Sequence, residues 1–160
     1  MTSPLLYSYQ LQDVRKLERL NGRGICAYDT GLGKTVLTLS YLQRCPDVRP
    51  VVVVCPSVMK ITWQREAEKH CGIRAELVEG MNPANAVVPL NPKMVIVNYD
   101  IVGPTRSGPG WLQWLQTLQP KMIVLDEAHL LGNLTTSRTK NCRKLCRGVK
   151  QVLALTATPI

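Results

Sequence analysis

Two short apolar runs in the sequence contain no polar residue. Residues 51–55 read VVVVC and residues 122–125 read MIVL. A strand with one face in water alternates apolar and polar residues, whereas an unbroken run is typical of a strand buried on both faces. Such strands occur in parallel sheets that carry helices on both sides. The two runs therefore predict an α/β fold.

The rest of the chain alternates short apolar runs with longer amphipathic segments. Strands are predicted over 24–28, 51–55, 75–78, 94–98, 122–126 and 152–156, and helices over about 34–44, 58–70, 110–118 and 137–147. This alternation predicts a mostly parallel central sheet. Residues 80–93 and 103–110 are rich in Pro, Gly and Asn and are too short for domain linkers. We therefore expect residues 1–160 to form a single domain.

Charge and cysteine usage narrow the class of protein. Twenty Lys and Arg residues face eleven Asp and Glu residues, a net charge of +9. This balance suits a polyanionic partner and equally a merely soluble basic domain. The six cysteines are scattered without a CxxC pair, which argues against a zinc site and favours reduced thiols in a cytosolic or nuclear type of compartment. No apolar stretch has membrane-spanning length, and no signal peptide is evident.

A phosphate-binding turn is predicted after the first strand. Gly31 and Gly33 leave room for backbone N–H groups to curl around phosphate oxygens, and a helix N-terminus follows. Lys34 would reach the β- and γ-phosphates, and the Thr35 hydroxyl would ligate Mg²⁺. Tyr28 stands where the GxxxxGKT pattern has its first glycine. The alternative is a glycine-rich turn that only caps a helix.

A second site, which is acidic, is predicted where the run MIVL ends. Asp126 and Glu127 follow a buried strand, and the carboxyl ends of parallel strands are where open α/β sheets bind ligands. Asp126 would hold Mg²⁺, and Glu127 would orient and deprotonate the attacking water. The alternative is a strand that simply ends in solvated acids. His129 alone decides nothing.

The segments DTGLGKT, DEAH and LTATPI occur in one order along the chain. In that order and spacing they resemble the first RecA-like domain of superfamily-two helicases, and in particular Swi/Snf-type DNA translocases. The resemblance covers residues 6–160. It implies a three-layer P-loop NTPase domain that binds ATP and Mg²⁺ and acts on nucleic acid, most often double-stranded DNA.

The resemblance also implies roles for individual residues. The LxxYQ element at residues 6–10 places the adenine-reading glutamine at Gln10, and motif III supplies the coupling of hydrolysis to nucleic-acid grip. The family's nucleic-acid contacts map to residues after the second and fourth strands. The implied ATP-binding residues are Gln10, Thr30, Gly31, Leu32, Gly33, Lys34 and Thr35; the coupling residues are His129, Thr156 and Thr158; the nucleic-acid contacts are Ser57, Lys60 and Asn98.

Two departures from the Swi/Snf pattern bear on the subfamily to which the chain is assigned within the superfamily. Tyr28-Asp29-Thr30 replaces Asp-Glu-Met before the phosphate turn, and Gly132 replaces a lysine. The TAT of motif III is commoner in other branches of the superfamily. A bacterial or phage member would fit this mixture.

A basic segment and the tryptophans each allow a structural interpretation as well as a functional one. Segment 137–150 holds six cations and no acid, with Cys142 and Leu145 predicted to face the sheet, so its outer face is either a DNA-backbone patch or an ordinary solvated helix face. Trp63 could stack on a base, but core packing is the favoured interpretation. Trp111 and Trp114 are predicted to pack.

The resemblance implies a partner lobe. In the family, a second RecA-like lobe supplies arginine fingers, and this sequence reaches only Pro159 and Ile160 beyond motif III. We therefore expect a second lobe in cis or in trans, and weak hydrolysis by the 160 residues alone. The competing hypothesis is a non-catalytic nucleotide- or nucleic-acid-binding module. An unrelated P-loop ATPase or kinase is disfavoured because kinases need no motif III.

Overall fold

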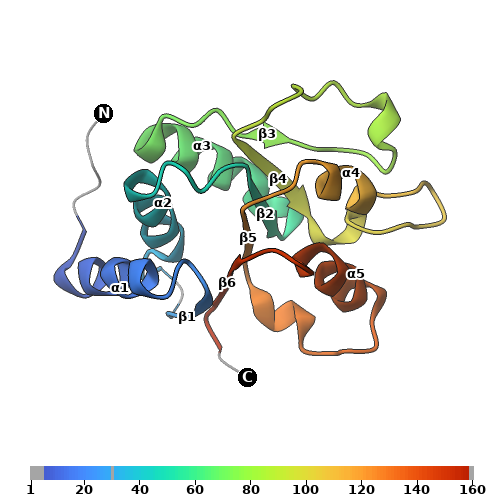
Figure 1. The fold of residues 1–160 in the computed structure, drawn as a ribbon. Helices are drawn as coiled ribbons and strands as arrows, with labels where there is room; N and C mark the ends of the chain where they lie inside the picture. Colours follow the sequence, from blue (N-terminus) through green and yellow to red (C-terminus); the bar gives the residue numbers. More distant parts are fainter. Residues whose placement is uncertain (1–5, 30, 159–160) are drawn as a thin grey trace.

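The computed structural model describes residues 6–29 and 31–158. Within these ranges strands and helices alternate around one central sheet (Figure 1). The strands are β1 (Gly24–Ala27), β2 (Val51–Cys55), β3 (Glu76–Leu77), β4 (Met94–Asn98), β5 (Met122–Leu125) and β6 (Gln151–Thr156). The α-helices are α1 (Ser8–Arg19), α2 (Lys34–Arg44), α3 (Lys60–Cys71), α4 (Leu112–Thr117) and α5 (Ser137–Cys146). Short 3-10 helices η1 (Ser57–Met59), η2 (Pro83–Asn85), η3 (Tyr99–Ile101) and η4 (Ala128–Leu131) lie in the connections.

The sheet has the strand order β1-β6-β5-β2-β4-β3, and each pairing among the described strands is parallel. The predicted parallel α/β fold is therefore confirmed. Because the strands share one direction, the loops that follow them meet at one edge, which we call the carboxyl edge. The loops that lead into them meet at the opposite edge, the amino edge.

Helices cover both faces of the sheet, which explains the unbroken apolar runs. Val51, Val53 and Cys55 face a core formed with α1, α2 and α3, whereas Val52 and Val54 face a second core with α4 and α5. Figure 1 shows these two helical layers on either side of the strands. The three-layer architecture expected from the resemblance is thus confirmed.

Two elements differ from the predicted ones. The helix α1 is absent from the predictions, although Gln10, Val14 and Leu17 are buried at the i, i+4 and i+7 spacing of an amphipathic helix. Strand β3 has two residues instead of the predicted four, because only Glu76 and Leu77 pair with β4.

The described helices are all too short or too polar to span a bilayer. The six cysteines lie in the described part of the chain as free thiols, with Cys55 and Cys142 buried.

Candidate active site

The phosphate-binding turn leads from β1 into α2. Gly31 and Gly33 adopt φ values of 85° and 81°, a left-handed conformation that favours glycine. Gly33 caps α2 without any side-chain cap, so the first N–H groups of the helix have no side-chain acceptor. An uncapped helix N-terminus of this kind is suited to an anion. Thr30, a predicted ATP contact, lies outside the described residues.

Lys34 begins α2 with its ammonium turned toward the strand. The side chain is 9% exposed, and Nζ donates to the backbone carbonyl of Tyr28 at 3.0 Å. A carbonyl holds an ammonium less strongly than a phosphate does, so this contact can be exchanged for a ligand oxygen. Thr35 follows in the first turn and is partly exposed.

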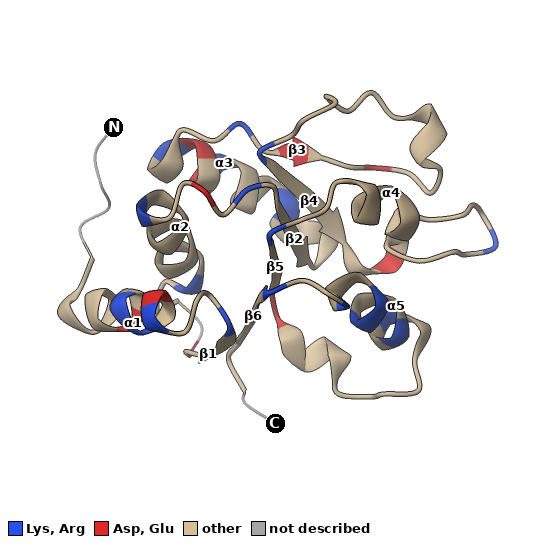
Figure 2. Cartoon of the chain, in the orientation of Figure 1, with Lys and Arg blue, Asp and Glu red and all other residues tan. Residues whose placement is uncertain are grey.

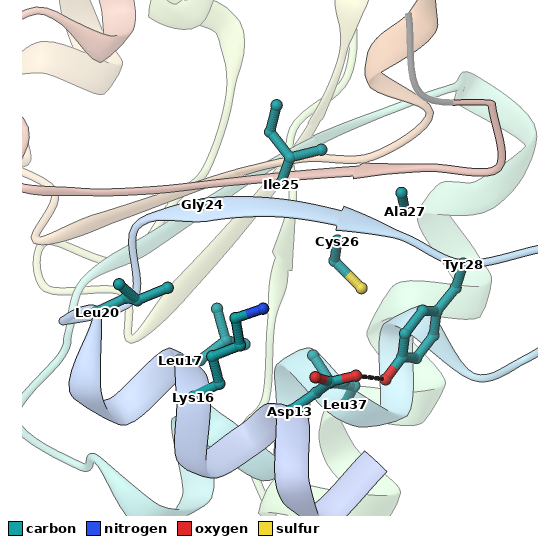
Figure 3. A pocket seen from close by; sticks show the side chains of 10 residues that line it. All are labelled: Asp13, Lys16, Leu17, Leu20, Gly24, Ile25, Cys26, Ala27, Tyr28 and Leu37. Carbon is teal, nitrogen blue, oxygen red and sulfur yellow. Dashed lines mark hydrogen bonds between the residues drawn. The ribbon is translucent and has the colours of Figure 1, made fainter. Parts of the chain in front are cut away.

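Helix α1 is fastened to the phosphate turn. Gln10 Nε2 and Tyr9 Oη both donate to the carbonyl of Leu32, at 3.1 Å and 3.4 Å. The Tyr28 hydroxyl donates to the carboxylate of Asp13, and Figure 3 shows these two side chains pointing toward each other between β1 and α1. The predicted base-reading residue Gln10 is therefore held against the turn.

Asp126 follows β5 at the carboxyl edge and is only 3% exposed. Trp63 Nε1 donates to its Oδ2 at 2.8 Å, and the backbone N–H of Glu127 donates to its Oδ1 at 3.0 Å. The Tyr99 hydroxyl donates to its backbone carbonyl at 2.7 Å. Both the side chain and the backbone of Asp126 are thus fixed in orientation.

Burial dominates the electrostatics of Asp126. Burial raises the pKa of its carboxyl group above the ordinary value, and the Trp63 hydrogen bond opposes that rise. The neighbouring Glu127 raises this pKa further, while the positive charge of Lys34 lowers it. The strand order β1-β6-β5 brings the loops that carry Lys34 and Asp126 to the same edge, with one strand between them.

Glu127 and the residues predicted to couple hydrolysis to nucleic-acid grip lie at the same edge. Glu127 has a φ of 52°, and its Oε2 lies 3.3 Å from His129 Nδ1. At the end of β6, the Thr156 hydroxyl donates to the carbonyl of Thr158 at 2.9 Å and accepts from its N–H at 3.2 Å. Since β6 lies between β1 and β5, this turn stands between the phosphate turn and Asp126.

The three residues predicted to contact nucleic acid differ in their solvent exposure. Ser57 is exposed in η1, and Asn98 is partly exposed at the end of the neighbouring strand β4. Lys60 differs: it is 8% exposed, and its Nζ donates to the carbonyl of Val78 at 2.6 Å. Burial lowers the pKa of this ammonium. As placed here, Lys60 offers no exposed cation to a nucleic-acid strand and supports the backbone before residue 80 instead.

The tryptophans follow the structural interpretation, whereas the exposed cations of α5 fit both of its interpretations. Trp63 and Trp111 are completely buried, and Trp111 stacks edge-on against Trp114 with ring centroids 5.2 Å apart. Packing is therefore confirmed for them. On α5, Cys142 and Leu145 face the core. The cations Lys140, Arg143, Lys144 and Arg147 are exposed on its outer side.

The donors at this edge fit a magnesium nucleotide. Thr35 and Asp126 supply the oxygen atoms that Mg²⁺ prefers. Glycine at position 33 lets Gln10 pack closely against the phosphate turn, since a Cβ there would lie 2.5 Å from Gln10 Nε2. Among the described residues, no group of three His, Cys, Asp or Glu side chains could hold a metal alone. A site of this composition suits a Mg²⁺ ion that is carried largely by substrate phosphates.

Comparison with known proteins assigns the family. A family model described as the SNF2-related domain matches residues 9–160. The chain belongs to the SNF2-related domain family. It is 30% identical over 159 residues to a Xenopus tropicalis protein named SWI/SNF-related matrix-associated actin-dependent regulator of chromatin subfamily A-like protein 1, and 30% identical over 179 residues to Protein CHROMATIN REMODELING 19 of Arabidopsis thaliana.

These alignments cover 96% and 98% of this SNF2-related domain but only 16% and 23% of the two relatives. The chain therefore spans less than a quarter of either protein. A solved structure, described as "Sulfolobus solfataricus SWI2/SNF2 ATPase core in complex with dsDNA", matches with a TM-score of 0.81 and 24% identity, over 98% of this chain and 33% of that one. This likeness shows the shared fold.

Two contacts of the SNF2-related domain are missing from the sequence predictions. Trp63 and Tyr99 both hold Asp126, yet they lie 63 and 27 residues before it. A buried indole N–H or phenol requires a polar partner, and that requirement was the available signal. The identity of the partner depends on which strands are neighbours, which the sequence pattern does not specify.

Proposed function

We propose that this chain is the ATP-binding and ATP-hydrolysing lobe of a DNA helicase or translocase. The observation that carries the proposal is that Lys34, in the turn after β1, and Asp126, after β5, lie at one carboxyl edge with only β6 between their strands. A cation for phosphates and an acid for Mg²⁺ are required together for phosphoryl chemistry.

Each group at the edge then has a task. The uncapped N–H groups of α2 and the ammonium of Lys34 bind phosphate oxygens, and Gln10 contacts the base. Thr35 and Asp126 would hold Mg²⁺, which when bound neutralises charge that develops on the phosphates. Glu127 is partly exposed beside His129 and accepts the proton of the attacking water.

The coupling and nucleic-acid assignments extend this proposal. Thr156 and Thr158, in the turn between the phosphate turn and Asp126, are proposed to couple hydrolysis to nucleic-acid grip together with His129, which contacts Glu127. Ser57 and Asn98 are proposed to contact the backbone of double-stranded DNA, and the solved Sulfolobus solfataricus relative, an ATPase core in complex with dsDNA, supports that partner. A second RecA-like lobe, in cis or in trans, supplies the arginine that accelerates hydrolysis.

Nucleotide binding tests the core of the proposal. The 160-residue chain is titrated with a fluorescent ATP analogue with and without Mg²⁺, together with Lys34→Ala and, as a matched control, the exposed Lys16→Ala. Loss of binding only in Lys34→Ala supports the site. Equal binding by all three proteins would refute it.

Glu127→Gln separates an ATPase from a binding module. In an ATPase, the substitution leaves nucleotide binding intact and removes turnover, because the base is lost while the phosphate contacts remain. Turnover is measured with the chain alone and with an added SNF2-family second lobe. A chain whose turnover never exceeds that of Glu127→Gln would be a non-catalytic nucleotide-binding module.

A further inference from the structure

A basic residue stands one or two positions before every strand of the described sheet. The six residues are Arg23, Arg49, Arg74, Lys93, Lys121 and Lys150, which precede β1, β2, β3, β4, β5 and β6. Because the strands are parallel, all six lie at the amino edge, opposite the candidate active site. We call this set the basic rim.

The sheet arranges the basic rim as a row. In the order of the strands it reads Arg23, Lys150, Lys121, Arg49, Lys93, Arg74. Neighbouring strands lie about 4.8 Å apart, so the row extends over roughly 24 Å. Figure 2 shows the blue segments that lead into the strands following one another across the middle of the molecule.

The cations of the rim make no salt bridge in the described structure, although Asp47, whose carbonyl accepts from Lys121, lies at the same edge. All rim residues except Arg49 are exposed. The end of α5 brings further exposed cations, Arg143, Lys144 and Arg147, toward Lys150. A row of like charges repels itself, and a polyanion relieves that repulsion.

Helix dipoles give a partial alternative reason for the rim. Helices that alternate with parallel strands end at this edge, and cations are favourable near helix C-termini. Arg23 Nη1 lies 3.4 Å from the carbonyls of Val149 and Lys150, and Lys121 Nζ donates to the carbonyl of Asp47 at 3.0 Å. A helix dipole does not explain Lys93, since this residue follows the long loop after β3 and not an α-helix.

We infer that the basic rim binds the sugar-phosphate backbone of a nucleic acid, at a surface separate from the one proposed for Ser57 and Asn98. A linear row of cations matches a linear polyanion, and DNA carries one negative charge per 1.7 Å or so of helix axis. Apart from the two-residue β3, the strands have four to six residues and separate the two edges by about 13–20 Å. Contacts along the rim therefore leave the nucleotide site open, and they read no base sequence.

Anisotropy of a short fluorescein-labelled DNA duplex, measured over a series of KCl concentrations, tests the rim. The rim variant carries Lys93→Gln, Lys121→Gln and Lys150→Gln in the full chain. Three lost phosphate contacts weaken duplex binding by about tenfold or more and lower the slope of log K against log salt by about 2 to 3. Replacing the same lysines by arginine preserves binding because the charges remain.

The matched control removes the same net charge elsewhere. It carries Arg15→Gln, Lys16→Gln and Arg65→Gln, three exposed cations on α1 and α3. Binding by this control close to the unsubstituted chain supports the rim. Equal losses in both variants, or no loss in the rim variant, would overturn it.

A nucleotide titration of the same proteins keeps the two proposals separate. Unchanged binding of the ATP analogue by the rim variant shows that it is folded and that its nucleotide site is intact. If the chain binds the duplex through the rim but binds no nucleotide, the proposed ATPase function is refuted and the proposed DNA binding by the rim is supported.

Discussion

Trp63 Nε1 donates a hydrogen bond of 2.8 Å to Asp126 Oδ2, although the two residues lie 63 positions apart. The indole comes from α3 and the carboxylate from the loop after β5. Both side chains are buried, so water does not replace the donor if it is removed. The bond therefore makes a residue of the core a support for the candidate metal ligand.

Trp63→Phe keeps an aromatic ring in the core and removes the donor. We expect the free energy of unfolding to fall by about 1–3 kcal/mol, the cost of leaving a buried acceptor unpaired. We also expect Mg²⁺-dependent nucleotide binding to weaken, because the Asp126 carboxylate loses one of the two donors that orient it. Urea unfolding and titration of the ATP analogue measure the two effects.

Trp111→Phe is the matched control for this change. Trp111 is equally buried, and its Nε1 donates to the carbonyl of Gly80 at 2.9 Å in the other core. A similar loss of stability with unchanged nucleotide binding is expected. If both variants weaken nucleotide binding alike, the Trp63 bond has no special role.

Gly33→Ala tests the space beside the phosphate turn. A Cβ at this position would lie 2.5 Å from Gln10 Nε2, in addition to the strain of a side chain at φ 81°. Gly148 has the same φ of 81°, but its Cβ would meet no heavy atom within 4 Å. Both variants should lose about 1–3 kcal/mol of stability. Only Gly33→Ala should lose nucleotide binding, which calorimetric titration would measure, and equal binding by the two would contradict the expected crowding.

Gln10→Ala tests the contact between α1 and the nucleotide base. The Gln10 amide holds the carbonyl of Leu32 and accepts from the N–H of Tyr7, so its removal loosens the turn as well as the base contact. We expect ATP affinity to fall about tenfold, equivalent to one good hydrogen bond, with a smaller effect on GTP. Gln12→Ala, an exposed neighbour on the same helix, should change neither affinity. A parallel fall for both nucleotides would remove the base-reading role and leave a structural one.

Alkaline pH should destabilise the fold through its buried thiols. Burial raises the pKa of Cys55 and of Cys142 from the ordinary value of 9.0 to about 12. Below pH 9 both thiols are protonated in the folded and unfolded chains, and this stability is fully present. As the pH rises from 9 toward 12 the unfolded chain releases these protons first, so the stability is lost.

Urea unfolding midpoints between pH 8 and pH 11 measure this decline. The double variant Cys55→Ala, Cys142→Ala lacks both groups and should show a shallower fall, although it starts from a lower stability because two core side chains are shortened. Identical slopes for the two proteins would show that the thiols do not contribute.

Much of the fold could be predicted from residue patterns. The runs at β2 and β5 are buried on both faces, so their unbroken apolarity identified them directly. Helix α1 was missed although its buried positions have helical spacing, since Gln10, a polar residue, occupies one of them. Strand β3 was predicted too long because Ala75 and Val78 are buried although they lie outside the strand; Val78 still donates one hydrogen bond to the carbonyl of Ile96.

The residues of the candidate site could be predicted, but the side chains that hydrogen-bond to them could not. Lys34 and Asp126 were identified because each follows a strand, and parallel strands bring such positions to one edge. Lys60 illustrates the limit: a lysine near the end of a strand looks available for DNA, but here it satisfies a carbonyl inside the fold. Which polar atom a buried side chain meets depends on the lateral order of strands, and local sequence does not encode that order.

The two anchors of Asp126 have a mechanical consequence. Trp63 belongs to the helix that follows Ser57, and Tyr99 follows Asn98 directly, so each proposed DNA contact is rigidly continuous with one anchor. Under the proposed function, a duplex bound at Ser57 or Asn98 would shift a hydrogen-bond donor of the Asp126 carboxylate or of its backbone. Movement of the DNA would then change the geometry of the proposed Mg²⁺ ligand directly, without bending of the sheet.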